Sequence, residues 1–321
     1  MQWNLIGAAF GSGLLMLPTA TFSQQYPSKL VRLVIPYPAG GPTDTVGRLL
    51  AQRLSEQTGR TFLIDNAPGA NGAIGADKVA KSKPDGYTLL FNASVFTTSP
   101  MVSKVIPYSV ESDFTPLALV AKGPLAVAVT KELPVQDIGG LIAYAKAAPD
   151  KLAFAIGSIA SAGHLSTELL KQQGGIDFLV VPYKGSAPAY QDLLGGQIQG
   201  FIDPLLGGLS HYKANRIKML AVTSKERVPS LPNMATVGET LSGFEFYSWY
   251  GVWGPAKLPE EIVAKVNGEV NKALTSGALR ERLMQEGYFL APGTPEEFAR
   301  FQQEDMERSA KIIADGKIQP E

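Results

Sequence analysis

The sequence contains no cysteine among its 321 residues. This absence excludes disulfide bonds, thiolate metal sites and a cysteine nucleophile, and it is compatible with any cellular compartment. An excess of charge is also missing, because 29 lysine and arginine residues balance 29 aspartate and glutamate residues. The bulk charge therefore gives no sign of a nucleic acid or a membrane surface as partner, and selectivity must come from local groups.

The motifs of the common enzyme classes are missing as well. We find no nucleophile elbow, Walker lysine, dinucleotide fingerprint or zinc-protease helix, and His164 and His211 lack the spacing of metal ligands. Ser161 and His164 are residue types that can act together in catalysis, but no residue that would orient the histidine stands beside them. We predict no catalytic residue, no metal site and no cofactor.

Long apolar runs are absent except at the N-terminus. Residues 5–17 are apolar, uncharged and rich in small side chains, and Thr21 and Ser23 then fit a signal-peptidase cleavage pattern. The run is short for a membrane span, so we interpret residues 1–23 as a signal peptide and expect a soluble exported protein. Residues 1–4 carry no lysine or arginine, which departs from that pattern and leaves a buried helix or an anchor as the alternative.

From residue 29 onward, apolar runs alternate with amphipathic stretches, which is typical of a parallel sheet covered by helices. Residues 30–36 predict a strand, and a Gly/Pro turn leads from it into a helix over 43–57. Strands over 61–65 and 87–91 also end in loops of small polar residues. Any α/β protein has glycine at such turns, but ligands bind at the carboxyl ends of strands, so the recurrence predicts a binding site.

The second half of the chain repeats this plan. Residues 114–129 predict two apolar strands separated at Lys122 and Gly123, the second of which enters another sheet. Polar clusters then follow strands predicted over 152–156, 178–182 and 200–203. An aromatic strand over 244–255 is followed only by helices, predicted over 259–274, 277–286 and 295–315. Three helices cannot form a domain alone and must pack on the first half.

These features predict two doubly wound α/β lobes. Lobe I contains residues 24–122 and 246–321, and lobe II contains residues 123–245. The chain crosses between the lobes twice, so we expect a two-segment hinge with a ligand cleft between the lobes.

The strand-end loops contain donors that suit a small anion. The first N–H groups of a helix lack internal partners, and the helix dipole is positive there. The backbone donors that we predict belong to Gly40, Gly41, Gly72 and Gly163. The side chains that we predict around the anion are those of Thr43, Asn71, Ser94, Ser158, Ser161 and Tyr183.

Five further side chains in these loops have two interpretations each. Lys184 is either a ligand for the anion or a solvated surface lysine. Asp44 is a helix cap or a ligand contact. Asp203 accepts a hydrogen bond from a ligand hydroxyl or amine, or it satisfies a nearby turn. Tyr37 and Phe96 stack on a planar ligand or pack in the core.

Several motifs in order resemble one known family. They are Tyr26-Pro27, residues 34–44 (Val-Ile-Pro-Tyr-Pro-Ala-Gly-Gly-Pro-Thr-Asp), residues 66–75 (Asn-x-Pro-Gly-Ala-Asn-Gly-x-x-Gly) and residues 84–90 (Pro-Asp-Gly-Tyr-Thr-Leu-Leu). Together they are similar to the Bug family, the extracytoplasmic solute-binding proteins of tripartite tricarboxylate transporters. The resemblance covers the whole mature chain and implies a type II periplasmic-binding-protein fold.

The resemblance also implies a site in which the first lobe holds one carboxylate, often through ordered waters, while the second lobe recognises the rest of the ligand. Carried over, the first-lobe positions are Tyr37, Ala39, Gly40, Thr43, Asp44, Asn71 and Gly72. The second-lobe positions are Ser158, Ser161, His164, Tyr183, Lys184, Gly185 and Asp203. Ile159 and Ala162 make the loop over 157–163 less glycine-rich than in relatives, which suggests an aromatic dicarboxylate of the terephthalate type.

We therefore expect a monomeric periplasmic receptor that captures a small organic carboxylate, either a di- or tricarboxylate or an aromatic dicarboxylate, and delivers it to a membrane permease. The alternative is a hydrolase or transferase that acts on an anionic substrate in the same cleft. A sensor that partners a membrane kinase shares the same cleft, and the sequence does not separate it from a receptor.

Overall fold

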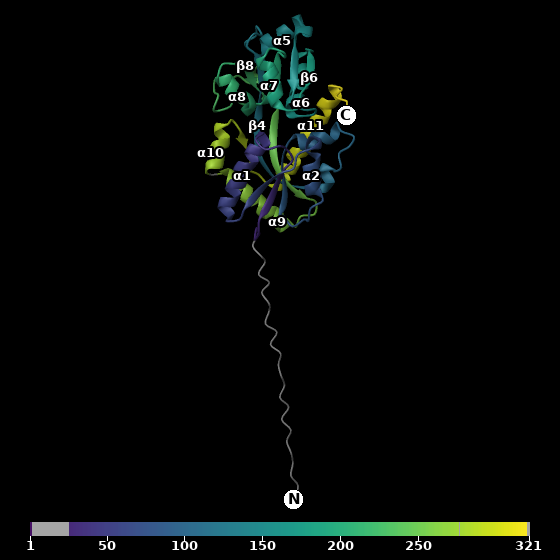
Figure 1. Cartoon of the computed structure of the whole chain (residues 1–321), viewed down its shortest axis with the longest axis vertical. Helices are drawn as coiled ribbons and strands as arrows, with labels where there is room; N and C mark the ends of the chain where they lie inside the picture. Colours follow the sequence, from purple (N-terminus) through teal and green to yellow (C-terminus); the bar gives the residue numbers. More distant parts are fainter. Residues whose placement is uncertain (2–25, 276, 320–321) are drawn as a thin grey trace.

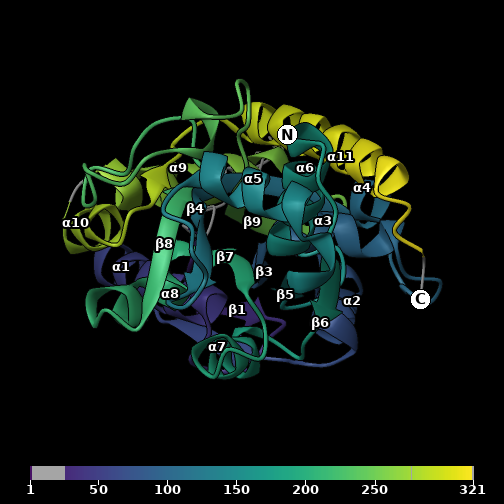
Figure 2. The ribbon, with the colours of Figure 1, turned by 90° about the horizontal axis from the view of Figure 1, so that it is seen from above.

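The computed structural model describes residues 1, 26–275 and 277–319. Apart from its first residue, the segment interpreted as a signal peptide lies outside the described residues. A mixed sheet of ten strands forms the centre of the molecule, and helices cover it (Figures 1 and 2). The predicted α/β class is confirmed. Within the described ranges, no helix has the length and apolar character needed to cross a membrane.

The first part of the sheet contains three parallel strands, β1 (Val31–Ile35), β2 (Phe62–Asn66) and β3 (Thr88–Ala93), with β9 (Tyr247–Pro255) antiparallel beside β3. The helices α1 (Pro42–Thr58) and α2 (Ala73–Ala80) pack on its two faces. β1 is buried everywhere except at Arg32 because it has neighbours on both edges and helices on both faces. We call this part the first sheet and its packing the first core.

β4 (Phe114–Thr130) is one continuous strand, so the prediction of two separate strands is wrong. The expected change of sheet does occur: β4 pairs with β9 as far as Pro124 and with β7 and β8 beyond it. Gly123 lets the strand pass the ring of Tyr288, because a Cβ there would lie 2.8 Å from a ring carbon. Pro124, which has no N–H to donate, lies where the hydrogen-bond partners change.

The second sheet contains the end of β4 together with β5 (Ala153–Ile156), β6 (Leu179–Pro182), β7 (Gly200–Pro204) and β8 (Ile217–Val222). Its helices are α5 (Ile138–Ala147), α6 (Ala162–Gly174), α7 (Ser186–Leu194) and α8 (Leu205–Lys213). We call their packing the second core. Sequence reasoning missed α8, because Gly207 and Gly208 disfavour a helix. A residue with a side chain would not fit at position 208, because a Cβ there would lie 2.5 Å from the hydroxyl oxygen of Tyr190.

The C-terminal segment contains α9 (Glu260–Thr275), α10 (Ala278–Gln285), β10 (Phe289–Leu290) and α11 (Pro295–Asp315). β10 pairs with β4 at Ala121 and Lys122, so the expectation of helices without a further strand is wrong. α9 and α10 pack on the first core as expected. The remaining short helices are α3 (Val95–Thr98), α4 (Val110–Asp113), η1 (Ala70–Gly72), η2 (Ser99–Met101), η3 (Pro149–Lys151) and η4 (Val237–Glu239).

The last helix, α11, lies against both cores. Its N-terminal half packs on the first core through Phe298, and Asp305 accepts a hydrogen bond of 2.8 Å from the buried indole N–H of Trp249 in β9. Its C-terminal half places Ile312 and Ile313 in the second core. Figure 1 shows the helix crossing from the lower to the upper half of the molecule. The division into two lobes at the stated boundaries remains a prediction.

Candidate functional site

The loop between β1 and α1 is held by Asp44, which does not cap the helix. The helix begins after Gly41 without a side-chain cap. The Asp44 carboxylate is 2% exposed and accepts hydrogen bonds from the Gly40 N–H (2.8 Å), the Arg48 Nε–H (2.8 Å) and the Asn66 side-chain amide (2.9 Å). Burial opposes ionisation, but these donors outweigh it and lower the carboxyl pKa. Asp44 therefore positions the loop, and the N–H of Gly40 is occupied.

The loop after β2 has an unusual backbone. Four consecutive residues, 69–72, have positive φ angles of 131°, 45°, 51° and 92°, although the middle two are alanine and asparagine. Strained backbone of this kind is concentrated at functional sites. The N–H of Gly72 donates to the Gly69 carbonyl at 2.9 Å, and the Asn71 amide donates to Ser99 at 3.1 Å. These two predicted donors are thus already engaged within the protein.

Tyr37 contacts this second loop. A Cβ at Gly72 would lie 3.2 Å from the Tyr37 hydroxyl oxygen, so the glycine allows the ring to approach. That oxygen is buried and has no hydrogen-bond partner among the described residues. Burial raises the pKa of Tyr37, so the neutral hydroxyl can both donate and accept a hydrogen bond. A buried polar group without a partner normally finds one in a ligand or in water.

Two residues of the first-sheet loops serve the fold. Phe96 is 2% exposed and packs against the rings of Tyr108, Phe114 and Trp253, with centroid distances of 4.9–5.4 Å. It belongs to the first core, so the interpretation of Phe96 as a ligand-stacking ring is not supported. Ser94 is buried at the end of β3, and its N–H donates to the Trp249 carbonyl at 2.8 Å. Ala39 and Gly41 lie in the β1–α1 loop, and Thr43 is buried in the first turn of α1.

In the second sheet, the loop between β5 and α6 is internally bonded. The Ser161 hydroxyl donates to the Ser158 carbonyl at 2.8 Å and accepts the His164 N–H at 3.3 Å, which makes Ser161 the N-cap of α6. His164 is buried, and its Nδ1 accepts the Ala160 N–H at 3.1 Å. Burial and then the charge of Lys171 lower the His164 pKa to about 4. The histidine is therefore neutral and structural, and it is not placed to activate Ser161.

The loop between β6 and α7 leaves Lys184 and Gly185 exposed. The Tyr183 hydroxyl donates to Asp192 at 2.6 Å, and the N–H of Gly185 donates to the Gly157 carbonyl at 2.8 Å. Lys184 is exposed, and its ammonium forms no ion pair within the described ranges. Its side chain is a cation of these loops that a ligand can reach.

Asp203, at the carboxyl end of β7, is 5% exposed. One carboxyl oxygen accepts a hydrogen bond of 2.9 Å from Ser186, and the other has no partner in the described chain. Burial raises its pKa to about 7, although the hydroxyls of Ser186 and the neighbouring Tyr190 oppose the shift. A carboxyl that keeps its proton can donate a hydrogen bond to an anion, which an ionised one cannot.

The Asp203 carboxyl also lies near the first core. Its charge contributes to the raised pKa of Tyr250, a buried residue of β9, and Tyr250 in turn contributes to the raised pKa of Tyr37. In both tyrosines burial is the larger cause. We call the strand-end loops of the two sheets, together with these three side chains, the polar region.

A buried contact joins the two groups of loops. Thr98, at the end of α3, donates to the Ala160 carbonyl at 2.8 Å, and Ala160 has a left-handed φ of 55°. Sequence reasoning missed Thr98, Ser186 and Tyr250 as parts of this region. Thr98 and Ser186 lie in polar clusters that the pattern identified, whereas Tyr250 lies inside a strand and gave no signal.

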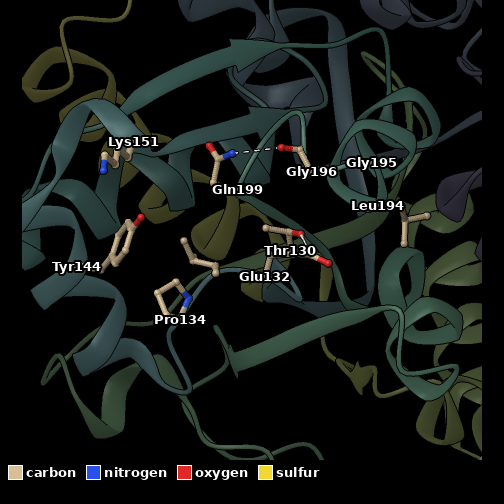
Figure 3. A pocket seen from close by; sticks show the side chains of 10 residues that line it. Thr130, Glu132, Pro134, Tyr144, Lys151, Leu194, Gly195, Gly196 and Gln199 are labelled. Carbon is tan, nitrogen blue, oxygen red and sulfur yellow. Dashed lines mark hydrogen bonds between the residues drawn. The ribbon is translucent and has the colours of Figure 1, made fainter.

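A cavity of about 450 Å³ lies away from this region, at the far end of β4 (Figure 3). Thr130, Tyr144, Lys151 and Gln199 line it, and none of the predicted site residues does. The Gln199 amide donates to the Gly196 carbonyl at 3.4 Å, and its oxygen accepts the Ala153 N–H at 3.0 Å. The polar groups of Gln199 are thus satisfied internally, and the strand-end loops remain the better candidate site.

Comparison with known protein families identifies the family of this chain. A family model described as "Tripartite tricarboxylate transporter family receptor" matches residues 46–318. The chain belongs to this family. The Bug resemblance is confirmed by the protein BugT of Bordetella pertussis, which is 34% identical over 293 residues that make up 90% of this chain and 89% of BugT.

Two solved structures support the assignment of this chain to the tripartite tricarboxylate transporter receptors. An R. palustris protein solved with adipate is 36% identical, with a TM-score of 0.85 over 92% of this chain and 100% of the other. MatC from Rhodopseudomonas palustris, solved with bound malate, is 31% identical, with a TM-score of 0.78 over 90% of this chain and 100% of the other. The solute-binding-protein fold that the resemblance implies is thus confirmed, and the family is one of receptors.

Proposed function

We propose that the protein is a periplasmic receptor that binds a small organic dicarboxylate at the strand-end loops of both sheets and delivers it to a membrane permease. The observation that carries this proposal is that two of the buried polar atoms without partners in the described chain, the Tyr37 hydroxyl and one oxygen of Asp203, lie one at each group of strand-end loops. A ligand between the loops would give both atoms a partner.

We further propose that residues 24–122 and 246–321 form lobe I, that residues 123–245 form lobe II, and that the ligand cleft lies between them. The change of partners along β4 at Pro124 supports a hinge there, and the second crossing lies just before β9, where the Phe246 N–H still donates to the Thr223 carbonyl beyond β8. Closure of the lobes would expel water and strengthen the hydrogen bonds to the ligand. The contact of α11 with both cores means that its C-terminal half must shift when the lobes rotate.

For the ligand, we favour an aliphatic diacid in the size range of malate to adipate. Both solved relatives contain such acids. The residues that suggested an aromatic diacid serve the fold instead, because Ala162 is buried in the second core and Ile159 packs partly against it. Terephthalate is included among the acids in the titration described below. Lys184 would neutralise one carboxylate, and the N–H groups of the first turn of α1 would bind the other.

We expect Lys184→Ala and Ser158→Ala each to weaken diacid binding roughly tenfold, because hydrogen bonds to charged groups contribute about 1.5–3 kcal/mol. Isothermal titration with malate, adipate, citrate and terephthalate measures the effect. Lys146→Ala, which removes an exposed lysine from α5, is the matched control and should bind as wild type does. Dissociation constants that are unchanged in both test variants would place the site elsewhere.

The same samples separate a receptor from the alternative hydrolase or transferase. A receptor returns its ligand unchanged, so incubation with each acid should yield no product by mass spectrometry. A thermal-shift series identifies the acids to test, because a bound ligand raises the melting temperature by mass action. Turnover of any acid would contradict the receptor assignment for this chain.

A further inference from the structure

A second cavity, of about 400 Å³, lies at the junction of the two sheets. Residues of α9, α10 and β10 and one residue of a loop beyond β8 contribute to its wall. They include Leu274, Arg280, Met284, Leu290 and Pro229. In Figure 1, α10 lies at the level where β4 passes between the upper and lower halves of the molecule. The cavity therefore opens on the flank of the proposed hinge.

The wall of this cavity belongs to both cores. Phe289 and Leu290 are adjacent in β10, yet Phe289 packs on the second core and Leu290 packs on the first. Just before them, a Cβ at Gly287 would lie 3.0 Å from both Leu205 and Val228. Rotation of one sheet against the other therefore changes the distance between α10 and the loop that carries Pro229, and it reshapes the cavity.

The cavity is also linked to the candidate ligand site. The ring of Tyr288, which lines the cavity, packs on Gly123 and lies 5.7 Å from the ring of Tyr250. Tyr250 and Tyr288 are buried in the first core, and Tyr37 packs against the same core. The first core therefore connects the cavity with Tyr37, one of the groups proposed to contact the ligand.

The side chains that line this cavity indicate which kind of group it could bind. Leu274, Met284 and Leu290 make it mainly apolar, Thr275 and Tyr288 add hydroxyl groups, and Met284 is 39% exposed. Arg280 lies one helical turn from Met284 on the same face of α10, is exposed, and forms no ion pair among the described residues, whereas Arg282 is paired with Glu286. An apolar pocket with one unpaired guanidinium at its rim fits an apolar side chain that is flanked by a carboxylate.

We propose that this cavity docks an extracytoplasmic segment of the membrane partner that presents an apolar side chain beside an aspartate or glutamate. Because both cores form the wall, docking depends on the relative position of the two sheets, and the partner can recognise the ligand-bound receptor. The inference rests on the proposed receptor function, since a receptor of a tripartite transporter must transfer its ligand to a membrane component.

The test uses the full-length protein in cells that contain its transporter. Arg280→Glu and Met284→Glu should lower the uptake of radiolabelled adipate or malate, whichever the wild type binds, at least fivefold. Isothermal titration of the purified variants should give dissociation constants within twofold of wild type. Arg300→Glu, which reverses an exposed arginine on α11, is the matched control and should leave uptake unchanged.

A photocrosslinking residue at position 284 should join the receptor to a membrane protein when the diacid is present, and one at position 300 should not. Wild-type uptake by both cavity variants, or crosslinks from position 284 only to soluble proteins, would overturn the docking proposal. Failure of the wild type to bind any acid in titration would instead overturn the receptor function, so the two failures are distinguishable.

Discussion

Gly163→Ala is expected to destabilise the protein by about 3 kcal/mol and to weaken diacid binding at least tenfold. Gly163 lies in the first turn of α6, where the helix packs on β7. A Cβ at this position would overlap with the Ile202 carbonyl oxygen, which is a backbone atom that no side-chain rotation can move away. The helix must shift, and overpacking of this kind typically costs about 1–3 kcal/mol.

The shift also moves the candidate site, because Ser161 caps α6 and holds the Ser158 carbonyl. Chemical denaturation and isothermal titration measure the two effects separately. Gly268→Ala is the matched control: Gly268 is exposed in α9, and a Cβ there meets no atom within 4 Å. That change should stabilise the protein by up to about 1 kcal/mol, since alanine is the better helix former. Equal stability of the two variants would show that α6 does not approach β7 this closely.

The sequence pattern was sufficient for most elements of the fold because burial and hydrophobic period are local signals. The helix predicted over 43–57 occurs as Pro42–Thr58, and the one predicted over 295–315 occurs as Pro295–Asp315. The errors have nonlocal causes. Gly123 interrupts the apolar pattern as a strand end would, but its lack of a side chain accommodates Tyr288, which lies far along the chain. The two residues of β10 gain strand geometry only by pairing with β4.

The loops of the candidate site could be identified from the sequence, but the roles of their residues could not. Polar clusters do lie at the strand ends of both sheets. However, the sequence does not indicate that Asp44 accepts three hydrogen bonds, that His164 accepts the Ala160 N–H, or that Tyr183 donates to Asp192. Hydrogen-bond partners depend on which loops meet in space, and a polar residue that supports a loop has the same sequence signature as one that binds a ligand.

Asp203→Asn is expected to stabilise the protein above pH 7 and to have little effect near pH 4. Burial raises the pKa of this carboxyl from 3.8 to about 7 in the folded protein. The folded state therefore retains a proton that the unfolded chain has released, so this group lowers stability as the pH rises from about 4 to about 7. At about 1.36 kcal/mol per pKa unit, the largest expected difference in the free energy of unfolding is about 4 kcal/mol.

The asparagine side chain keeps an oxygen that can accept the hydrogen bond from the Ser186 hydroxyl, so the substitution removes the titration and retains this contact. Urea denaturation of wild type and variant at pH 5, 6, 7 and 8 should give a stability difference that grows with pH in favour of the variant. Asp150→Asn, at an exposed position, controls for the loss of one surface charge.

His164 has the opposite effect on stability, because burial lowers its pKa from 6.5 to about 4 and the neutral folded form gains stability as the pH rises through that window. The contribution of His164 is common to wild type and to Asp203→Asn, so it cancels in the difference between them. The stability difference therefore reports only the titration of the Asp203 carboxyl. The proton on this carboxyl decides whether Asp203 donates a hydrogen bond to an anion or repels it. A stability difference that does not change with pH would mean that the Asp203 carboxyl is already ionised at pH 5 in the folded protein.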